Sequence, residues 1–278
     1  MKDINLFIDK NNNYISKKEI FEALQYLKAN HSDYLFIHSQ INFGNPLLKK
    51  NELLKHLADI FLELKIANLI FPVFTFSFCN KEDFDLESSK SKMGILNEYF
   101  RKLDFSMRTK DPLMSCSLIA KDKDLFNIGN KSCGKDSIFD KLHNKENVKF
   151  LFFGNRVHNC FTYSHYIEDY LKVPYRYDKE FSGNIINKDN KTFETFILPV
   201  RYANVLAFDD DTMSKELDKF NAIERINIGD SQIEIVNEKQ SFNIIKNAIE
   251  NNIDFMLKHP YPRDFLDKTY IYEKKVAL

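Results

Sequence analysis

The sequence predicts a three-layer α/β/α protein, with helices on both faces of a central, mostly parallel or mixed sheet and an additional strand-rich C-terminal part. Short apolar runs alternate with amphipathic helical patterns from residue 16 to residue 171, which is typical of parallel strands with covering helices. Beyond residue 172 the apolar runs cluster as strands separated by turns. The length of 278 residues suits one large domain, so we expect a single domain over 1–278, with 172–236 as a candidate strand-rich subdomain.

The first part of the chain supplies helices and strands in alternation. Ser16 and Glu19 form a capping box, the Ser-x-x-Glu pattern that starts a helix. An apolar run at 34–38 predicts a buried strand that ends in a His-Ser pair, and an amphipathic pattern predicts a helix over 50–64. A second apolar run predicts a strand over 68–74. This order favours a parallel sheet.

A long polar connection over 76–92 follows the second strand. Unstructured loops of this length in compact domains tend to be functional or disordered. After the connection we expect a helix over 94–103, a strand over 115–120 and a short helix over 137–143.

The segment from 148 to 171 carries the strongest chemical pattern. The apolar run 148–153 ends at a glycine and predicts a buried strand, and a helical pattern follows over 161–171. His165 and Glu168 are three residues apart, so they share a helix face and can touch. A carboxylate beside an imidazole fixes its tautomer and raises its basicity, as a general base requires, although most such pairs are plain helix contacts.

The C-terminal part predicts clustered strands and two helices. The expected strands, with a hairpin formed by the last two, are 175–181, 192–201, 205–208, 225–228 and 232–236. The expected helices cover 212–220 and 241–257.

Composition excludes several classes of function. Lys plus Arg and Asp plus Glu each number 40, so no global charge draws the chain to nucleic acid or to anionic lipid. The four cysteines form no C-x-x-C pair, which argues against zinc ribbons and redox motifs. The N-terminus lacks the pattern of a signal peptide, and the apolar run 69–78 is too short to span a membrane. We therefore expect a cytoplasmic protein.

Six segments follow one another in a characteristic order. They are I-H-S-Q at 37–40, F-P-V-F-T-F-S-F at 71–78, M-G-I-L-N-E-Y-F-R at 93–101, M-R-T-K-D-P at 107–112, C-G-K-D-S-I-F-D-K-L at 133–142, and L-F-F-G with T-Y-S-H-Y-I-E between 151 and 168. Taken together, they resemble the aminoglycoside 3-N-acetyltransferase family over roughly residues 20 to 185. The resemblance implies an α/β/α antibiotic-resistance type of enzyme that transfers an acetyl group from acetyl-coenzyme A to an amine.

The resemblance also implies roles for individual residues. His165 of the T-x-x-H-x-x-E segment becomes the catalytic base and Glu168 its partner. The donor-binding candidates, taken from the motifs and from the expected sheet edge, are His38, Ser39, Thr75, Arg108, Asp111, Pro112 and Ser115. The acceptor-binding candidates are Glu98, Thr162 and Asp209, the last in an acidic run that could attract a cationic sugar or simply start a helix. No metal is expected, and the state of assembly, monomer or homodimer, stays open.

Two features depart from the family pattern. The family loop reads Arg-Ser-x-His-Pro, whereas here it reads Arg-Thr-Lys-Asp-Pro at 108–112, and only Gly44 remains of the glycine-rich segment after the His-Ser strand. The acceptor half of the chain also diverges. The acceptor is therefore either an aminoglycoside or an amino sugar of a bacterial surface glycan.

The chemistry of acyl transfer fits these residues. The acceptor amine must be neutral to attack, and His165, oriented by Glu168, can take its proton. Backbone N–H groups at strand-to-helix turns can stabilise the developing oxyanion, and Arg108 and the turn at Ser39 can bind the donor's phosphates. The structural interpretations stand beside these roles, because His38 could simply pack, and Glu98 and Arg101 could form an ordinary helix pair or anchor the loop 76–92.

Two other functions remain open. A metal-dependent hydrolase would use His165, Glu168 and His158 as ligands, because His-x-x-Glu with a nearby His has metal-ligand character. A non-catalytic protein would bind coenzyme A or a glycan without turnover, which the change at Asp111 and the missing glycines motivate.

Overall fold

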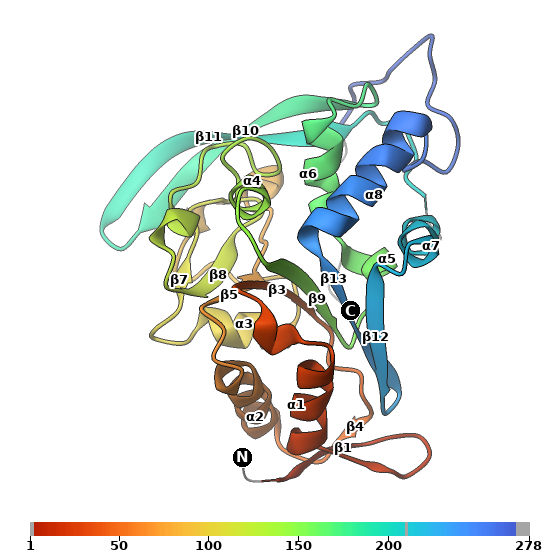
Figure 1. The fold of residues 1–278 in the computed structure, drawn as a ribbon. Coiled ribbons are helices and arrows are strands. Elements are labelled where there is room, and N and C mark those ends of the chain that lie inside the picture. The colour runs from red at the N-terminus through yellow and green to blue at the C-terminus, as the bar shows by residue number, and fades with distance from the viewer. Residues whose placement is uncertain (1–2, 209–210, 271–278) are drawn as a thin grey trace.

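The computed structural model describes residues 3–208 and 211–270. At its centre lies a seven-stranded mixed sheet (Figure 1). Three parallel strands form the middle of this sheet, and antiparallel strands extend it on both sides. In spatial order the strands are β12 (Ile223–Ile228), β13 (Ser231–Asn237), β9 (Val148–Phe153), β3 (Tyr34–Ser39), β5 (Asn68–Pro72), β8 (Cys116–Ala120) and β7 (Met107–Arg108).

Helices cover both faces of the central sheet (Figure 1). One face packs against α1 (Lys17–Tyr26), α2 (Lys50–Glu63) and α3 (Ile95–Arg101). The other face packs against α4 (Ile138–His143), α5 (Val157–Cys160), α6 (Tyr163–Tyr170), α7 (Thr212–Lys219) and α8 (Glu238–Asn251). Phe150 and Phe152 of β9 enter one apolar core, whereas Leu151 and Phe153 enter the other. The expected three-layer α/β/α class is confirmed.

A second sheet contains a long hairpin that projects past the body of the protein (Figure 1). Its strands are β10 (Arg176–Asn187), β11 (Asn190–Arg201) and the short β6 (Phe84–Asp85). The strands of residues 172–236 therefore divide, because β10 and β11 build this sheet while β12 and β13 extend the central one. The assignment of 172–236 as an acceptor-binding subdomain of a single domain stays a prediction.

Several element predictions needed correction. No strand covers 205–208, where only an isolated bridge joins Ala207 to Leu257. The last helix, α8, begins earlier than expected at Glu238 and ends at Asn251, because Asn252 has an extended backbone. A small N-terminal sheet of β2 (Tyr14–Ser16), β1 (Asn5–Ile8) and β4 (Asn45–Pro46) was not predicted.

Local sequence features fix the start of α1 and the turn that follows β9. Ser16 caps α1 by accepting a hydrogen bond from the Glu19 N–H at 3.2 Å, as the capping box predicts. Gly154, directly after β9, has φ +68°, and a Cβ there would lie 1.9 Å from the Gln40 carbonyl oxygen. Only glycine permits this turn and this close approach, which brings the ends of β3 and β9 together.

Candidate functional site

A cavity of about 800 Å³ opens at the carboxyl ends of the parallel strands. Its wall includes His38 and Ser39 of β3, Pro72 of β5 and Asn155 after β9. The segment from 91 to 98, which runs into α3, supplies most of the remaining wall. The edge formed by strand carboxyl ends is the usual ligand site in open α/β sheets, and the volume falls in the range of small-molecule sites.

His38 is a buried, neutral imidazole in this wall. Its side chain stacks on Phe152 with ring centroids 5.3 Å apart, and the residue is 5% exposed. Burial lowers the pKa of His38 to about 3. Its Nε2 atom is buried and has no hydrogen-bond partner among the described residues. Buried polar atoms are rarely left unpaired, so this nitrogen is suited to a polar group of a ligand.

Ser39 is already engaged inside the protein. Its hydroxyl donates to Asn97 Oδ1 at 2.6 Å, and Asn97 in turn donates to the Pro72 carbonyl oxygen at 2.8 Å. This chain of hydrogen bonds ties β3, β5 and α3 together at the edge of the cavity. Asn97 is fully buried and was not singled out from the sequence, although its Met-Gly-x-x-Asn-Glu context was.

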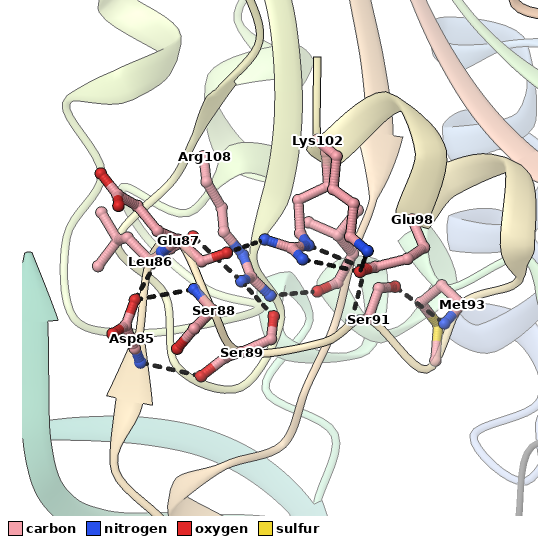
Figure 2. Close-up of polar contacts among 12 residues, drawn as sticks. Asp85, Leu86, Glu87, Ser88, Ser89, Ser91, Met93, Glu98, Lys102 and Arg108 are labelled. Carbon is pink, nitrogen blue, oxygen red and sulfur yellow. Dashed lines mark hydrogen bonds and ion pairs between the residues drawn. The ribbon is translucent and has the colours of Figure 1, made fainter. Parts of the chain in front are cut away.

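Glu98 anchors the loop that forms one side of the cavity (Figure 2). Its carboxylate accepts from Arg101 Nε and Nη2 at 2.8 and 2.7 Å, and from the Ser91 N–H at 2.9 Å. The hydrogen bonds to Arg101 and the Ser91 N–H outweigh the opposing effect of burial, so the pKa of Glu98 lies below its ordinary value. The pair therefore takes the loop-anchoring role that its i, i+3 spacing allowed.

Arg108 binds the same loop from the other side (Figure 2). Its guanidinium donates to the carbonyl oxygens of Ser89 at 2.6 Å and Val73 at 2.9 Å, and to Ser115 Oγ at 3.1 Å. It also stacks over the ring of Phe84 at 4.7 Å. Burial lowers the pKa of Arg108 to about 9. These contacts direct the guanidinium at the protein's own backbone, and Arg108 does not line the large cavity.

The remaining donor-binding candidates lie in the same internal network. Thr75 Oγ1 donates to the Pro112 carbonyl oxygen at 2.9 Å, and Ser115 Oγ donates to the Val73 carbonyl oxygen at 3.0 Å. Asp111 is 4% exposed, and its Oδ1 accepts from the Leu113 and Met114 N–H groups and from Ser132 Oγ. The aspartate that replaces the family histidine thus closes an internal turn.

A second constellation lies on α6 and the start of β10. His165 Nδ1 is 3.1 Å from Glu168 Oε2, and the same oxygen is 2.6 Å from Arg176 Nη2. The side chain of Glu168 is 1% exposed, whereas that of His165 is 38% exposed. The structure therefore forms the contact that the spacing of His165 and Glu168 predicts. Arg176 was missed, because no local pattern shows that a residue beginning a strand reaches back to a helix.

The charges of this constellation are set by their mutual contacts. Burial pushes the pKa of Glu168 up, but Arg176 and His165 pull it down more strongly, to about 2. Burial and the nearby Arg176 charge lower the pKa of His165, against the opposing effect of Glu168. Glu168 is therefore ionised and His165 neutral near pH 7.

Two smaller cavities flank these sites. One of about 210 Å³ is lined by Glu168, Arg176 and Pro199, among others. Another of about 530 Å³ shares Gln40, Asn42 and Asn155 with the large cavity. It adds the cationic residues Lys10 and Arg156. His165 lines none of the three cavities, so its exposed face lies outside their walls.

Two of the acceptor candidates belong to different helices, because Thr162 precedes α6 and Glu98 lies on α3. Thr162 lies one helical turn before His165, and its buried Oγ1 has no partner within the described residues. Glu98 instead binds Arg101 and the Ser91 N–H, a cluster that we call the loop anchor. Asp209 lies outside the described residues.

Metal-ligand character is weak in the described part of the chain. No three side chains of His, Cys, Asp or Glu there come close enough to hold a metal ion. The third member of the His165–Glu168 cluster is an arginine, and no contact between this pair and His158 is present. Within the same residues, no helix is long and apolar enough to cross a membrane.

Fold and site together define an α/β protein with a ligand-sized cavity at the carboxyl edge of its sheet. A family model described as aminoglycoside 3-N-acetyltransferase matches residues 69–250. The chain therefore belongs to the aminoglycoside 3-N-acetyltransferase family, whose enzymes are N-acetyltransferases that use acetyl-coenzyme A. The resemblance predicted from the sequence is confirmed.

Solved structures share the fold at low sequence identity. The sisomicin-bound AAC-VIa structure matches with a TM-score of 0.72 and 17% identity, over 84% of this chain and 97% of that chain. The complex of AAC-IIIb with CoASH matches with a TM-score of 0.70 and 13% identity, over 88% and 98%. The YokD protein from Bacillus subtilis matches with a TM-score of 0.65 and 14% identity, over 86% and 94%. None of the curated proteins matches the sequence.

Proposed function

We propose that this chain acetylates an amino group of an amino sugar, an aminoglycoside or a surface-glycan sugar, with His165 as general base and Glu168 as its positioning partner. The observation that carries the proposal is the contact of a partly exposed, neutral imidazole with a buried, ionised carboxylate. Family membership supports acetyl-coenzyme A as the donor.

The base function needs one tautomer of His165. With the proton on Nδ1, the ring donates to Glu168 and its Nε2 lone pair is free to accept a proton. The alternative, in which Nδ1 accepts from Arg176 at 3.0 Å, would leave the proton on Nε2 and remove the base. The shorter Arg176–Glu168 contact, at 2.6 Å, favours the first arrangement, because it directs the guanidinium at the carboxylate.

The reaction then balances without another reactant. The amine nitrogen forms a bond to the acetyl carbonyl carbon as the carbon–sulfur bond of the thioester breaks. The proton lost by the amine goes to His165 Nε2 and leaves with the thiol product. A base with a lowered pKa stays unprotonated at neutral pH, which is the state that this step requires.

The large cavity suits the donor. Coenzyme A supplies the activated acetyl group when bound, and the residues that would hold it are those of the cavity wall. The unpaired Nε2 of buried His38 offers a polar contact there. Lys10 and Arg156 of the adjoining cavity suit the donor's anionic phosphates. The internal contacts of Arg108 disfavour the phosphate-binding role expected for it.

The four cysteines are free, and two of them are buried, which suits a reducing compartment. We therefore place the enzyme in the cytoplasm. Monomer and homodimer both remain open as states of assembly.

Thiol release from acetyl-coenzyme A in the presence of an amine panel tests the proposal. We expect His165→Gln to lower kcat by about a hundred- to ten-thousandfold, the usual contribution of general-base catalysis. His158→Gln is the matched control, because His158 is a nearby histidine outside the constellation, and it should retain wild-type turnover.

The same two variants separate the alternatives. A metal-dependent hydrolase would lose activity with either histidine and would contain stoichiometric zinc. A non-catalytic binding protein would bind acetyl-coenzyme A without releasing thiol for any amine. Wild-type turnover by His165→Gln would contradict the proposed mechanism.

A further inference from the structure

Two arginines stand opposite each other where the long hairpin begins and ends. Arg176 of β10 and Arg201 of β11 are direct partners in the antiparallel register. Side chains of directly opposed residues extend from the same face of a strand pair. Like charges at such positions destabilise the pair unless something compensates them. The hairpin therefore places two positive charges on one face beside α6.

Only one of these two charges is compensated inside the protein. Arg176 pairs with Glu168 and donates to the Pro199 carbonyl oxygen at 2.8 Å. Arg201 is partly buried, and its side chain has no ion pair or hydrogen bond to any residue that the structure describes. Burial, and then the charge of Arg176, lower the pKa of Arg201, against the opposing effect of the Glu168 charge that Arg176 already binds.

The other charged groups of this region neutralise one another. Lys131 lies 2.8 Å from both Asp169 and Asp178, and Lys172 lies 3.0 Å from Asp169. Glu168 balances Arg176, and His165 is neutral near pH 7. The positive charge of Arg201 is therefore left over beside the base. Its register partner Arg176 lies 3.0 Å from His165 Nδ1, so Arg201 stands one strand away from the residue that touches the base. The charge of Arg201 adds to the lowering of the pKa of His165, after burial and Arg176.

This arrangement discriminates between acceptors. A polycationic sugar would meet a net positive charge next to the base, and like charges repel at close range. An acceptor that carries an anionic group would instead supply the missing partner of Arg201. A guanidinium binds planar carboxylates and phosphates with charge-assisted hydrogen bonds.

We propose that the acceptor is an amino sugar bearing a phosphate or a carboxylate, which Arg201 binds while His165 takes the proton of the amine. This rests on the proposed acetyltransferase function. The donor's own phosphates are not the partner of Arg201, because the pantetheine arm separates them from the thioester that must reach His165. Cationic side chains suited to those phosphates, Lys10 and Arg156, belong to a cavity that Arg201 does not line.

The test compares acceptors that differ in charge. Thiol release is measured with kanamycin, glucosamine, glucosamine 1-phosphate, glucosamine 6-phosphate, glucosaminuronic acid and uridine diphosphate glucosamine. We expect at least one anionic sugar to have a kcat/KM about ten- to a hundredfold above that of glucosamine, the effect of one hydrogen-bonded charge pair. Which anionic sugar is preferred distinguishes a free phosphate, a nucleotide and a carboxylate.

Arg201→Gln should raise KM for the preferred anionic sugar about ten- to a hundredfold, should change KM for glucosamine far less, and should leave KM for acetyl-coenzyme A unchanged. Lys191→Gln is the matched control. It removes one positive charge from the same strand, roughly 33 Å away at about 3.3 Å per residue, where Lys191 pairs with Asp83. Because the side chain of Arg201 pairs with none of the residues in 3–208 and 211–270, the variant should fold with wild-type stability, measured by urea unfolding.

The outcomes separate the two proposals. Equal or higher kcat/KM with glucosamine or kanamycin would overturn the anionic acceptor while leaving acetyl transfer intact, and so would a rise in KM for acetyl-coenzyme A in Arg201→Gln. If no amine releases thiol, the acetyltransferase proposal fails. Calorimetric titration with glucosamine 6-phosphate against glucosamine, in wild type and Arg201→Gln, then still decides whether Arg201 binds an anion.

Discussion

Two clusters of this protein each pair a glutamate with an arginine, and they differ in what surrounds them. In the loop anchor, Glu98 binds Arg101 and the Ser91 N–H, and Arg108 donates to backbone carbonyl oxygens nearby (Figure 2). On α6, Glu168 binds Arg176 but also contacts a histidine whose ring is 38% exposed. In the first cluster the charged groups bind the protein's own backbone, whereas the second cluster includes a histidine that can still accept a proton. Motifs of one family thus divide into those that build the cavity and those that suit chemistry.

The largest effect on stability should come from breaking the buried pair. Glu168→Gln leaves Arg176 buried without its counter-charge, so we expect a loss of about 3–5 kcal/mol in the free energy of unfolding. Turnover should fall as well, because the imidazole loses its orienting carboxylate. Urea unfolding and thiol release measure the two effects, and unchanged stability would show that Arg176 is not held by Glu168.

The same variant also tests how the free energy of unfolding depends on pH. The pKa of Glu168 lies at about 2 in the folded protein, below its ordinary value of 4.5. The stability that its charge contributes is therefore present above pH 4.5 and is lost as the pH falls toward 2. The difference in unfolding free energy between wild type and Glu168→Gln should shrink over that window.

Breaking the contacts of Arg108 with the loop 76–92 should lower stability and donor binding more than turnover. Arg108→Met removes several buried hydrogen bonds to the loop, so we expect about 2–4 kcal/mol lower stability and a higher KM for acetyl-coenzyme A. The kcat at saturating donor should stay close to that of wild type, since the guanidinium of Arg108 donates to the Ser89 and Val73 carbonyl oxygens and not to His165 or Glu168. A collapse of kcat with unchanged stability would instead place Arg108 in the chemistry.

The rate profile sharpens the assignment of the base. The acid limb of kcat/KM should have its midpoint below 6.5, because burial and Arg176 lower the pKa of His165. Activity should be lost as the pH falls through that lowered pKa. In Arg176→Gln the midpoint should move to higher pH, because a positive charge beside the ring is gone. If the midpoint of the acid limb is the same in Arg176→Gln and wild type, the titration of His165 does not produce that limb.

The smallest effect is expected at the rim of the loop anchor. Lys102 is 61% exposed and lies 3.6 Å from Glu98, so Lys102→Ala should change stability by less than about 1 kcal/mol. Arg101→Lys, on the same helix, loses a bidentate pair and should cost more, roughly 1–2 kcal/mol. Equal effects in urea unfolding would mean that the bidentate geometry of Arg101 adds nothing.

Sequence by itself determined the layers of this protein and the local half of its site. The run V-K-F-L-F-F at 148–153 has a single polar residue, Lys149, and no alternation of polar and apolar positions after it. A strand of this composition is buried on both faces, which predicts a central strand. The three-residue spacing of His165 and Glu168 determined their contact, because helical geometry alone brings such side chains together.

Only the tertiary structure decided the partners that come from distant segments. Arg176 reaches Glu168 because the hairpin folds back onto α6, and Arg201 joins it through strand register. Arg108, Thr75, Asp111 and Ser115 were expected around the donor, but the fold turns their polar atoms toward the backbone of neighbouring loops. The sequence states which polar groups each side chain carries. Which partners those groups bind depends on contacts between segments that are far apart in the chain.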